Sequence, residues 1–447
     1  MVTASSSLKL RAILRSSISR AGLGLPGGTV SGLVGAAQAL FVAGMHGPRV
    51  VVVVPTDADV ETMTADARFF LSGLEGRAEA DVARAVVPFP SHEVDPYRGL
   101  RPHFDIATAR ARALHHLASG TARIVIASVA ALFPRVASPD RLLAAAVALS
   151  AGDEISPQRL GEVLVDGGYR REDPVDEHGE FCVRGGVVDV FPAGEDRPVR
   201  LEFMGDTVES IRRYDPSTQR SVDALDLVSL VPLDEVPGVD PDAGGDADAL
   251  DPMTVRAQVA RAWLADYLQP GSHPTWLVSE YEQVARAGRA YAEQLAASHG
   301  EALAKGGTVP EPEALAIDWP SIERMIAGAT RLESLGIDEP PAHPEGGARL
   351  AAHRRIPCQP ALEFRGRVGD WAAEVERNRE AGETVVLVAA TTGRAERCIE
   401  LLTEYGVPAA GPNDPASLPS SVLVTTGILL ALMAGIAIKL KLFGLPS

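Results

Sequence analysis

The chain has 447 residues, of which 46% are hydrophobic and 23% charged, and its formal net charge is -17. This length predicts two or three domains with ample buried core. The negative charge argues against nucleic-acid binding over the whole protein surface, because phosphate binding needs a basic surface. The three cysteines are far apart in sequence, which argues against a disulfide framework or a metal site and favours a reducing, cytoplasmic compartment: Cys182, Cys358 and Cys398.

The first segment alternates helix and strand patterns. We interpret its Ser- and Arg-containing start as an amphipathic helix, in preference to a transit peptide, and the continuous apolar run RVVVVVP as a buried parallel strand. Further elements are expected in chain order at Leu8–Ile18 (helix), 49–55 (strand), Glu61–Leu71 (helix), Val86–Phe89 (strand), Ile106–Ser119 (helix) and 122–133 (strand, then a helical turn). This alternation predicts a doubly wound α/β sheet.

The second segment changes to a period of two. Three strand candidates are Glu180–Phe191, Val199–Met204 and Thr207–Tyr214, the last two joined by a short turn at Gly205-Asp206. Inside the first candidate, Gly185-Gly186 is interpreted as a bulge or a close backbone approach. The segment therefore predicts a small α+β unit with an antiparallel meander.

The remainder predicts helices, a second α/β unit and an apolar tail. Val422–Ile438 is 17 residues long without a charge and is followed by two lysines, which places it at the lower edge for a membrane span. We expect it to begin as the last strand of the second α/β unit and to continue as an apolar helix that tends to associate with other apolar surfaces but does not stably span a membrane. The other expected elements are helices at 253–268, 280–298, 369–381 and 393–405 and a strand at 383–391.

No catalytic or cofactor motif is complete. Gly32–Gly35 stands where a phosphate-binding loop would begin, but the chain continues Ala36-Ala37-Gln38, without the lysine and hydroxyl residue that hold phosphate and Mg²⁺. We therefore predict no ATP binding or hydrolysis, no cofactor and no metal site. Ser91-His92-Glu93 is interpreted as a Pro-flanked loop with an exposed histidine and no catalytic role.

The stretch HGEFCVRGGVVDVFP, residues 178–192, carries one arginine in a strand pattern. Side chains alternate along a strand, so Phe181 and Val183 share the core face and Arg184 points to the other face. Two interpretations remain open. In the first, Arg184 is a solvated side chain paired with Glu172 or Glu180, and the pair contributes little to stability. In the second, it is an anchor presented to an acidic partner surface.

Long motifs give the chain a resemblance to a known family. GGYRREDPVDEHGEFCVRGGVVDVFP and the strands after it resemble the UvrA-interaction domain shared by UvrB and the transcription-repair coupling factor, Mfd. FPSHEVDPYRGLRPHFD resembles the rest of the UvrB-homology module, and the region after CQPALEF resembles the small α/β domain that follows it in Mfd. The missing phosphate-loop lysine resembles the degenerate, non-hydrolysing copy in Mfd.

The resemblance implies a non-catalytic adaptor of bacterial transcription-coupled nucleotide-excision repair that binds UvrA. The residues it places at the UvrA contact are Arg170, Arg171, Phe181 and Arg184, while Cys182 stands where UvrB has an arginine. Full-length members of the family would also bind RNA polymerase and double-stranded DNA and act as ATP-dependent DNA translocases. Two alternatives stay open: a truncated fragment of such a translocase, or a protein tethered to a membrane by its tail.

The implied fold is a degenerate helicase-like parallel-sheet domain with an inserted antiparallel-meander domain and a second small α/β domain. The expected boundaries are 1–137 and 221–335 for the two parts of the UvrB-homology domain, 138–220 for the UvrA-interaction domain, 345–425 for the small α/β domain, and 426–447 for the tail.

Overall fold

The computed structural model describes residues 4–47, 49–236, 252–268, 273–305, 309–335, 353–356, 358, 364, 366–411 and 422–426. Contacts divide the chain into two compact units. Unit 1 comprises residues 1–86, 274–284 and 326–447, and unit 2 comprises residues 87–273 and 285–325.

Unit 1 is built on parallel strands in the order β15-β1-β14-β13-β2. All five residues of β2 are buried, as its continuous apolar run predicts. Helix α3 begins with a capping box in which Thr56 and Asp59 satisfy each other's backbone N–H groups. The elements are α1 (Ala4–Ala21), β1 (Thr29–Ser31), α2 (Ala37–Ala43), β2 (Val50–Val54), α3 (Asp57–Glu75), α4 (Glu79–Ala85), β13 (Thr275–Ser279), β14 (Thr330–Glu333) and β15 (His353–Arg355).

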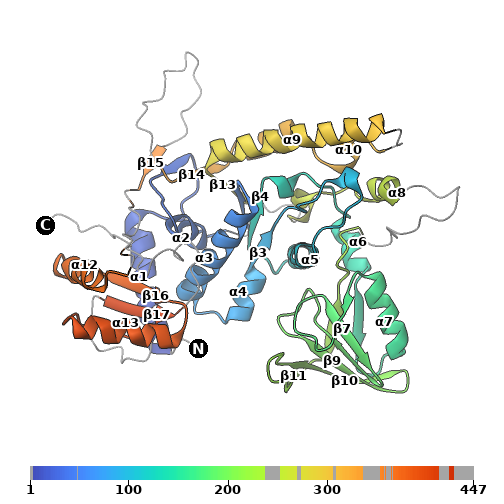
Figure 1. The fold of residues 1–447 in the computed structure, drawn as a ribbon, viewed down its shortest axis with the longest axis horizontal. Coiled ribbons are helices and arrows are strands. Elements are labelled where there is room, and N and C mark those ends of the chain that lie inside the picture. Colours follow the sequence, from blue (N-terminus) through green and yellow to red (C-terminus); the bar gives the residue numbers. More distant parts are fainter. Residues whose placement is uncertain are drawn as a thin grey trace, which may run out of the picture. The chain divides into compact units, whose positions relative to one another are not determined.

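The C-terminal part of unit 1 has a core of its own. Two parallel strands pair residue by residue, and two helices pack on them around Trp371, Leu387 and Leu402 (Figure 1, orange and red). These elements are α12 (Val368–Glu380), β16 (Val385–Ala389), α13 (Thr392–Glu404) and β17 (Val422–Thr426). The expected strand at the start of the tail is therefore confirmed, while residues 427–447 lie outside the described part. None of the described helices combines the length and apolar character that a membrane crossing requires.

Unit 2 begins with neighbouring strands β3 and β4 and continues into helices. Its α/β elements are β3 (Val86–Phe89), η1 (Pro96–Arg98), α5 (Phe104–Ala118), β4 (Ile124–Ser128), η2 (Ala130–Leu132) and α6 (Pro139–Ala144), and then α8 (Pro252–Val259), η3 (Leu264–Tyr267), most of α9 (Tyr281–Ala304), α10 (Pro312–Leu315) and α11 (Trp319–Ile326). The helix expected over 253–268 is wrong in its extent. It ends at Val259, and Ala262 pairs with Val136 as an isolated bridge before η3 begins.

The meander of unit 2 is a six-stranded sheet in the order β11-β10-β9-β8-β7-β6. Helix α7 packs on it, and a cluster that includes Leu160, Phe181 and Leu201 forms the core between them. The elements are β5 (Val147–Ser150), α7 (Pro157–Asp166), β6 (Arg170–Arg171), β7 (Glu180–Arg184), β8 (Val187–Val190), β9 (Val199–Met204), β10 (Thr207–Tyr214), β11 (Ser221–Ala224) and β12 (Leu227–Leu230), of which β5 and β12 pair separately (Figure 1, green).

The Gly185-Gly186 pair, expected as a bulge or a close backbone approach, forms a hairpin turn. The bulge is therefore wrong, while the close approach is confirmed, because a Cβ atom added to Gly186 would lie 3.1 Å from the Phe203 carbonyl oxygen. Arg184 pairs with Val187 across the turn, so the single strand expected over 180–191 is two antiparallel strands. Gly185 has φ +59°, a left-handed conformation that glycine adopts without the penalty of a Cβ atom. The turn between β9 and β10 at Gly205-Asp206 is as predicted. The α/β class, with a parallel sheet and a separate antiparallel meander, is confirmed.

Candidate protein-binding site

The edge strand β6 carries two of the predicted contact residues. Arg170 and Arg171 are both exposed, and they pair in parallel with Glu180 and Phe181 of β7. The guanidinium carbon of Arg170 lies 4.1 Å from the centroid of the Phe104 ring, a stacking contact that fixes its position. Edge strands offer unpaired backbone groups as well as side chains to a partner.

The structure places Phe181 in the core, with 1% of its surface exposed. It packs in the cluster beneath the sheet, so it has no exposed side chain with which to touch a partner. Its neighbour Cys182 is also buried, in a small cluster with Val175 and Phe191 on the other side of β7. Both sides of β7 are therefore packed at this level, and Phe181 can serve a docking surface only by holding the strand in place.

Arg184 is half exposed and lies in a charged network. Its guanidinium NH2 group is 2.9 Å from the carboxylate of Asp173 and 3.6 Å from that of Asp189. The expected partners Glu172 and Glu180 are wrong, because the chain before β7 turns Asp173 toward Arg184 and because Glu180 is buried and accepts the backbone N–H groups of 176 and 177.

Asp189 joins Arg184 to the middle of the sheet. It is 3% exposed and accepts two hydrogen bonds from Arg200, at 2.7 and 2.9 Å, in the bidentate geometry that makes arginine–carboxylate pairs strong. The guanidinium group of Arg200 also lies over the ring of Tyr214. Asp189 thus links Arg184 to Arg200, with the shorter contacts going to Arg200 and the longer one, 3.6 Å, to Arg184.

Sequence reasoning did not identify Asp173, Asp189 or Arg200. Asp189 and Arg200 are direct partners across β8 and β9, and the alternation of side chains alone could have placed them on one face once the register was known. The same register separates the two docking candidates. Arg171 lies opposite Phe181, whereas Arg184 points to the other side of β7, so the two arginines share the β6–β7 edge and not one face.

The degenerate phosphate loop in unit 1 is occupied by its own side chains. Counted from Gly32, the spacing of a phosphate-binding loop puts its lysine at Gln38. The Gln38 amide nitrogen lies 3.0 Å from a Glu280 carboxylate oxygen, and its carbonyl accepts from the Ser279 hydroxyl at 2.6 Å. A Cβ atom added to Gly32 would lie 2.2 Å from the carbonyl oxygen of Ile356, so the chain after β15 runs directly against the loop.

The histidine expected to be exposed is instead part of a buried network in unit 2. The His92 side chain is 18% exposed and lies 3.2 Å from the carboxylate of Glu235, which also pairs with the fully buried guanidinium group of Arg110. Burial and the neighbouring Arg110 lower the pKa of His92. The loop after β3 is therefore anchored by this network, because a buried carboxylate requires partners.

Residues 147–235 match the UvrB interaction domain family. This range covers the six-stranded sheet, helix α7 and the β5–β12 pair described above. A parallel α/β sheet with a degenerate phosphate loop and this inserted meander define the class: the chain is a UvrB-like α/β protein.

Comparison with curated proteins extends this similarity. The chain is 30% identical to the transcription-repair-coupling factor of Myxococcus xanthus over 419 residues, which are 84% of this chain and 34% of that protein. It is 36% identical to that of Haemophilus influenzae over 33% of this chain and 13% of that protein. The UvrABC system protein B of Synechocystis is 38% identical over 24% of this chain and 16% of that protein. The chain is thus similar over most of its length to a transcription-repair-coupling factor and in part to UvrB, and it spans about a third of the length of the Myxococcus relative.

Proposed function

We propose that this chain is an adaptor that binds UvrA through the β6–β7 edge of its meander domain and so takes part in transcription-coupled nucleotide-excision repair. The match of residues 147–235 to the UvrB interaction domain carries this proposal. In it, Arg171 and Arg184 make the contact, Arg170 and Phe181 position the two strands, and residues 138–220 are the expected UvrA-interaction domain.

The chemistry of this edge supports a protein partner with carboxylates. Arg171 is exposed, and Arg184 is half exposed between Asp173 and Asp189. Between residues 167 and 213 the chain has seven arginines and eleven carboxylates, so non-specific attraction to an acidic partner does not account for binding. A few positioned arginines, each able to make charge-assisted hydrogen bonds, would supply both the affinity and the orientation.

Competition with UvrB tests this proposal. The chain is labelled and titrated with purified UvrA, and UvrB is then added without a label. We expect saturable binding that UvrB displaces, because the two proteins share the interaction domain. Binding that persists unchanged at saturating UvrB would place the contact elsewhere, and the absence of any binding would refute the adaptor function.

We further propose that the chain acts without turning over ATP. The site that a phosphate would occupy holds the hydrogen bonds of Gln38, and the backbone after β15 lies against Gly32. Phosphate release by the pure chain with Mg²⁺ and ATP is therefore expected to equal that of a buffer blank. The same result is expected for the double variant Gln38→Lys with Ala39→Thr. This variant restores the lysine and the hydroxyl side chain of a phosphate-binding loop, but the backbone after β15 still lies against Gly32. Magnesium-dependent turnover by the wild type would contradict this prediction.

The proposal does not assign binding of RNA polymerase, binding of double-stranded DNA or translocase activity to this chain. It assigns these properties only to longer members of the family. The remaining boundaries of the proposal are 1–137 and 221–335 for the UvrB-homology domain and 345–425 for the small α/β domain.

A further inference from the structure

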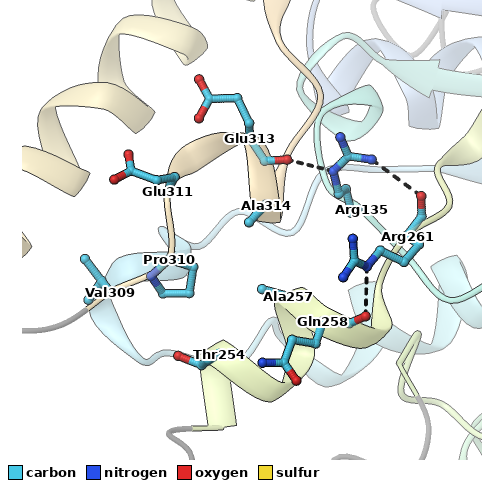
Figure 2. A pocket seen from close by; sticks show the side chains of 10 residues that line it. All are labelled: Arg135, Thr254, Ala257, Gln258, Arg261, Val309, Pro310, Glu311, Glu313 and Ala314. Carbon is cyan, nitrogen blue, oxygen red and sulfur yellow. Dashed lines mark hydrogen bonds between the residues drawn. The ribbon is translucent and has the colours of Figure 1, made fainter.

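Unit 2 contains a pocket of about 570 Å³ whose walls come from three chain segments. Figure 2 shows Arg135 and Arg261 on one side and Val309, Pro310 and Glu311 on the other. Backbone pairing builds it: the segment after η2 bridges Ala316 through Pro134 and Ala262 through Val136. Ala316 directly follows helix α10, and Ala262 lies shortly after helix α8. Arg135, between the two bridging residues, therefore lies where these two segments meet. The lining residues are Arg135, Thr254, Ala257, Gln258, Arg261, Val309, Pro310, Glu311, Glu313 and Ala314.

The two arginines of the pocket are held by backbone carbonyls. Arg135 donates from Nε to the Glu313 carbonyl at 2.8 Å and from NH1 to the Arg261 carbonyl at 3.4 Å, and Arg261 donates from Nε to the Gln258 carbonyl at 2.9 Å (Figure 2). Within the described residues, neither guanidinium group forms an ion pair with a carboxylate. These carbonyls fix the orientation of both guanidinium groups and engage only some of the five N–H donors that each group has. The pocket therefore has two oriented cations whose charges are not paired with a carboxylate within the described residues.

The opposite wall limits the charge of a ligand. Glu311 and Glu313 also line the pocket. Burial of the nearby Tyr97 raises its pKa to about 12, and the negative charges of Glu311 and Glu313 add to this rise. Tyr97 fixes that wall by donating a hydrogen bond to the Pro310 carbonyl at 3.0 Å. These carboxylates would repel a polyanion such as a triphosphate or a nucleic acid more strongly than a single carboxylate group bound at the arginines.

Volume and lining indicate an organic ligand. The pocket is many times larger than the roughly 30 Å³ that one water molecule occupies, and it falls in the range of small-molecule sites, about 300–1,000 Å³. Ala257, Ala314 and Pro310 supply apolar surface next to the arginines. An inorganic ion would leave this surface uncovered.

We propose that this pocket binds a small organic carboxylate, with its oxyanion on Arg261 and Arg135 and its aliphatic part against Ala257, Ala314 and Pro310. This inference is independent of UvrA binding, because no residue of the β6–β7 edge lines the pocket.

Hexanoate is the test ligand, and hexanamide, of nearly the same size without the charge, is its matched control. Saturation-transfer NMR with the full chain is expected to show saturable hexanoate binding in the millimolar range, at least about tenfold tighter than hexanamide, because charge-assisted hydrogen bonds exceed neutral ones by this order. Pyrophosphate is expected not to displace hexanoate, because it would face Glu311 and Glu313.

Three variants locate the site. Arg261→Gln removes the charge of an exposed side chain and is expected to weaken hexanoate binding about tenfold or more. Ala314→Leu fills the hollow without changing charge and is expected to weaken both probes. Arg159→Gln, in the exposed pair with Glu162 on α7, is the control and is expected to bind as the wild type does. Equal binding of hexanoate and hexanamide, unchanged binding by Arg261→Gln, displacement by pyrophosphate, or no binding at all would each overturn the proposal.

Discussion

The variant Glu235→Gln is expected to lose about 3–5 kcal/mol of unfolding free energy, because it leaves the charge of Arg110 buried without its counter-ion. The Arg110 side chain is 0% exposed and Glu235 is 4% exposed. Arg110 also donates to the Pro90 carbonyl at 2.6 Å, and its guanidinium carbon lies 4.0 Å from the centroid of the Phe89 ring. The loss is measured as the shift of the urea midpoint multiplied by the slope of the transition.

Two further variants separate the charge from the packing. Glu311→Gln removes a carboxylate that is 76% exposed and should change stability by no more than about 0.5 kcal/mol. The double variant Arg110→Met with Glu235→Leu removes both charges, and it should recover most of the loss, since apolar side chains of similar volume often replace a buried pair at little cost. A single variant Glu235→Gln as stable as Glu311→Gln would contradict the prediction.

The same network predicts the pH dependence of stability. Burial alone would raise the pKa of Glu235, but Arg110 and His92 outweigh it and hold the pKa well below its usual range. A depressed carboxyl pKa contributes stability that is present above the unfolded value, about 4.3, and is lost as the pH falls below it. The stability difference between the wild type and Glu235→Gln should therefore shrink as the pH falls below about 4, and a constant difference across this range would contradict it.

The variants Arg171→Glu and Arg184→Glu are each expected to lose about 2 kcal/mol or more of UvrA binding, mainly through faster dissociation, if each arginine anchors a partner carboxylate. Arg184→Glu also brings a third carboxylate next to Asp173 and Asp189, so Arg184→Gln is measured beside it to separate lost contact from local repulsion. Both substitutions leave the bidentate Asp189–Arg200 pair in place, and the fold should remain intact.

Arg394→Glu, on the exposed surface of α13 in unit 1, is the control and should bind UvrA as the wild type does. Surface plasmon resonance gives the association and dissociation rates of all variants. If the arginine variants of the meander bind like the control, Arg184 is a solvated strand residue whose ion pairs contribute well under about 1 kcal/mol.

The sequence by itself determined the elements whose signals are local. The strand at Val86–Phe89 has the predicted bounds, and the apolar run that becomes β2 is buried at every position. The motif at 178–192 indicated both the meander and the resemblance to UvrB and Mfd. Such features depend on side chains within a few residues of one another, through strand periodicity, turn residues and caps.

Only the tertiary structure decided which charges meet. Arg110 and Glu235 are 125 residues apart in sequence, and nothing local to either predicts their pairing. Arg184 meets Asp189 because the Gly185-Gly186 turn folds β8 back onto β7, and it meets Asp173 because the chain before β7 turns toward it. The pocket likewise exists because one backbone segment bridges Ala262 and Ala316. The physical reason is common to all three: burial and ion pairing depend on the distance between atoms in space, which periodicity along the chain does not specify.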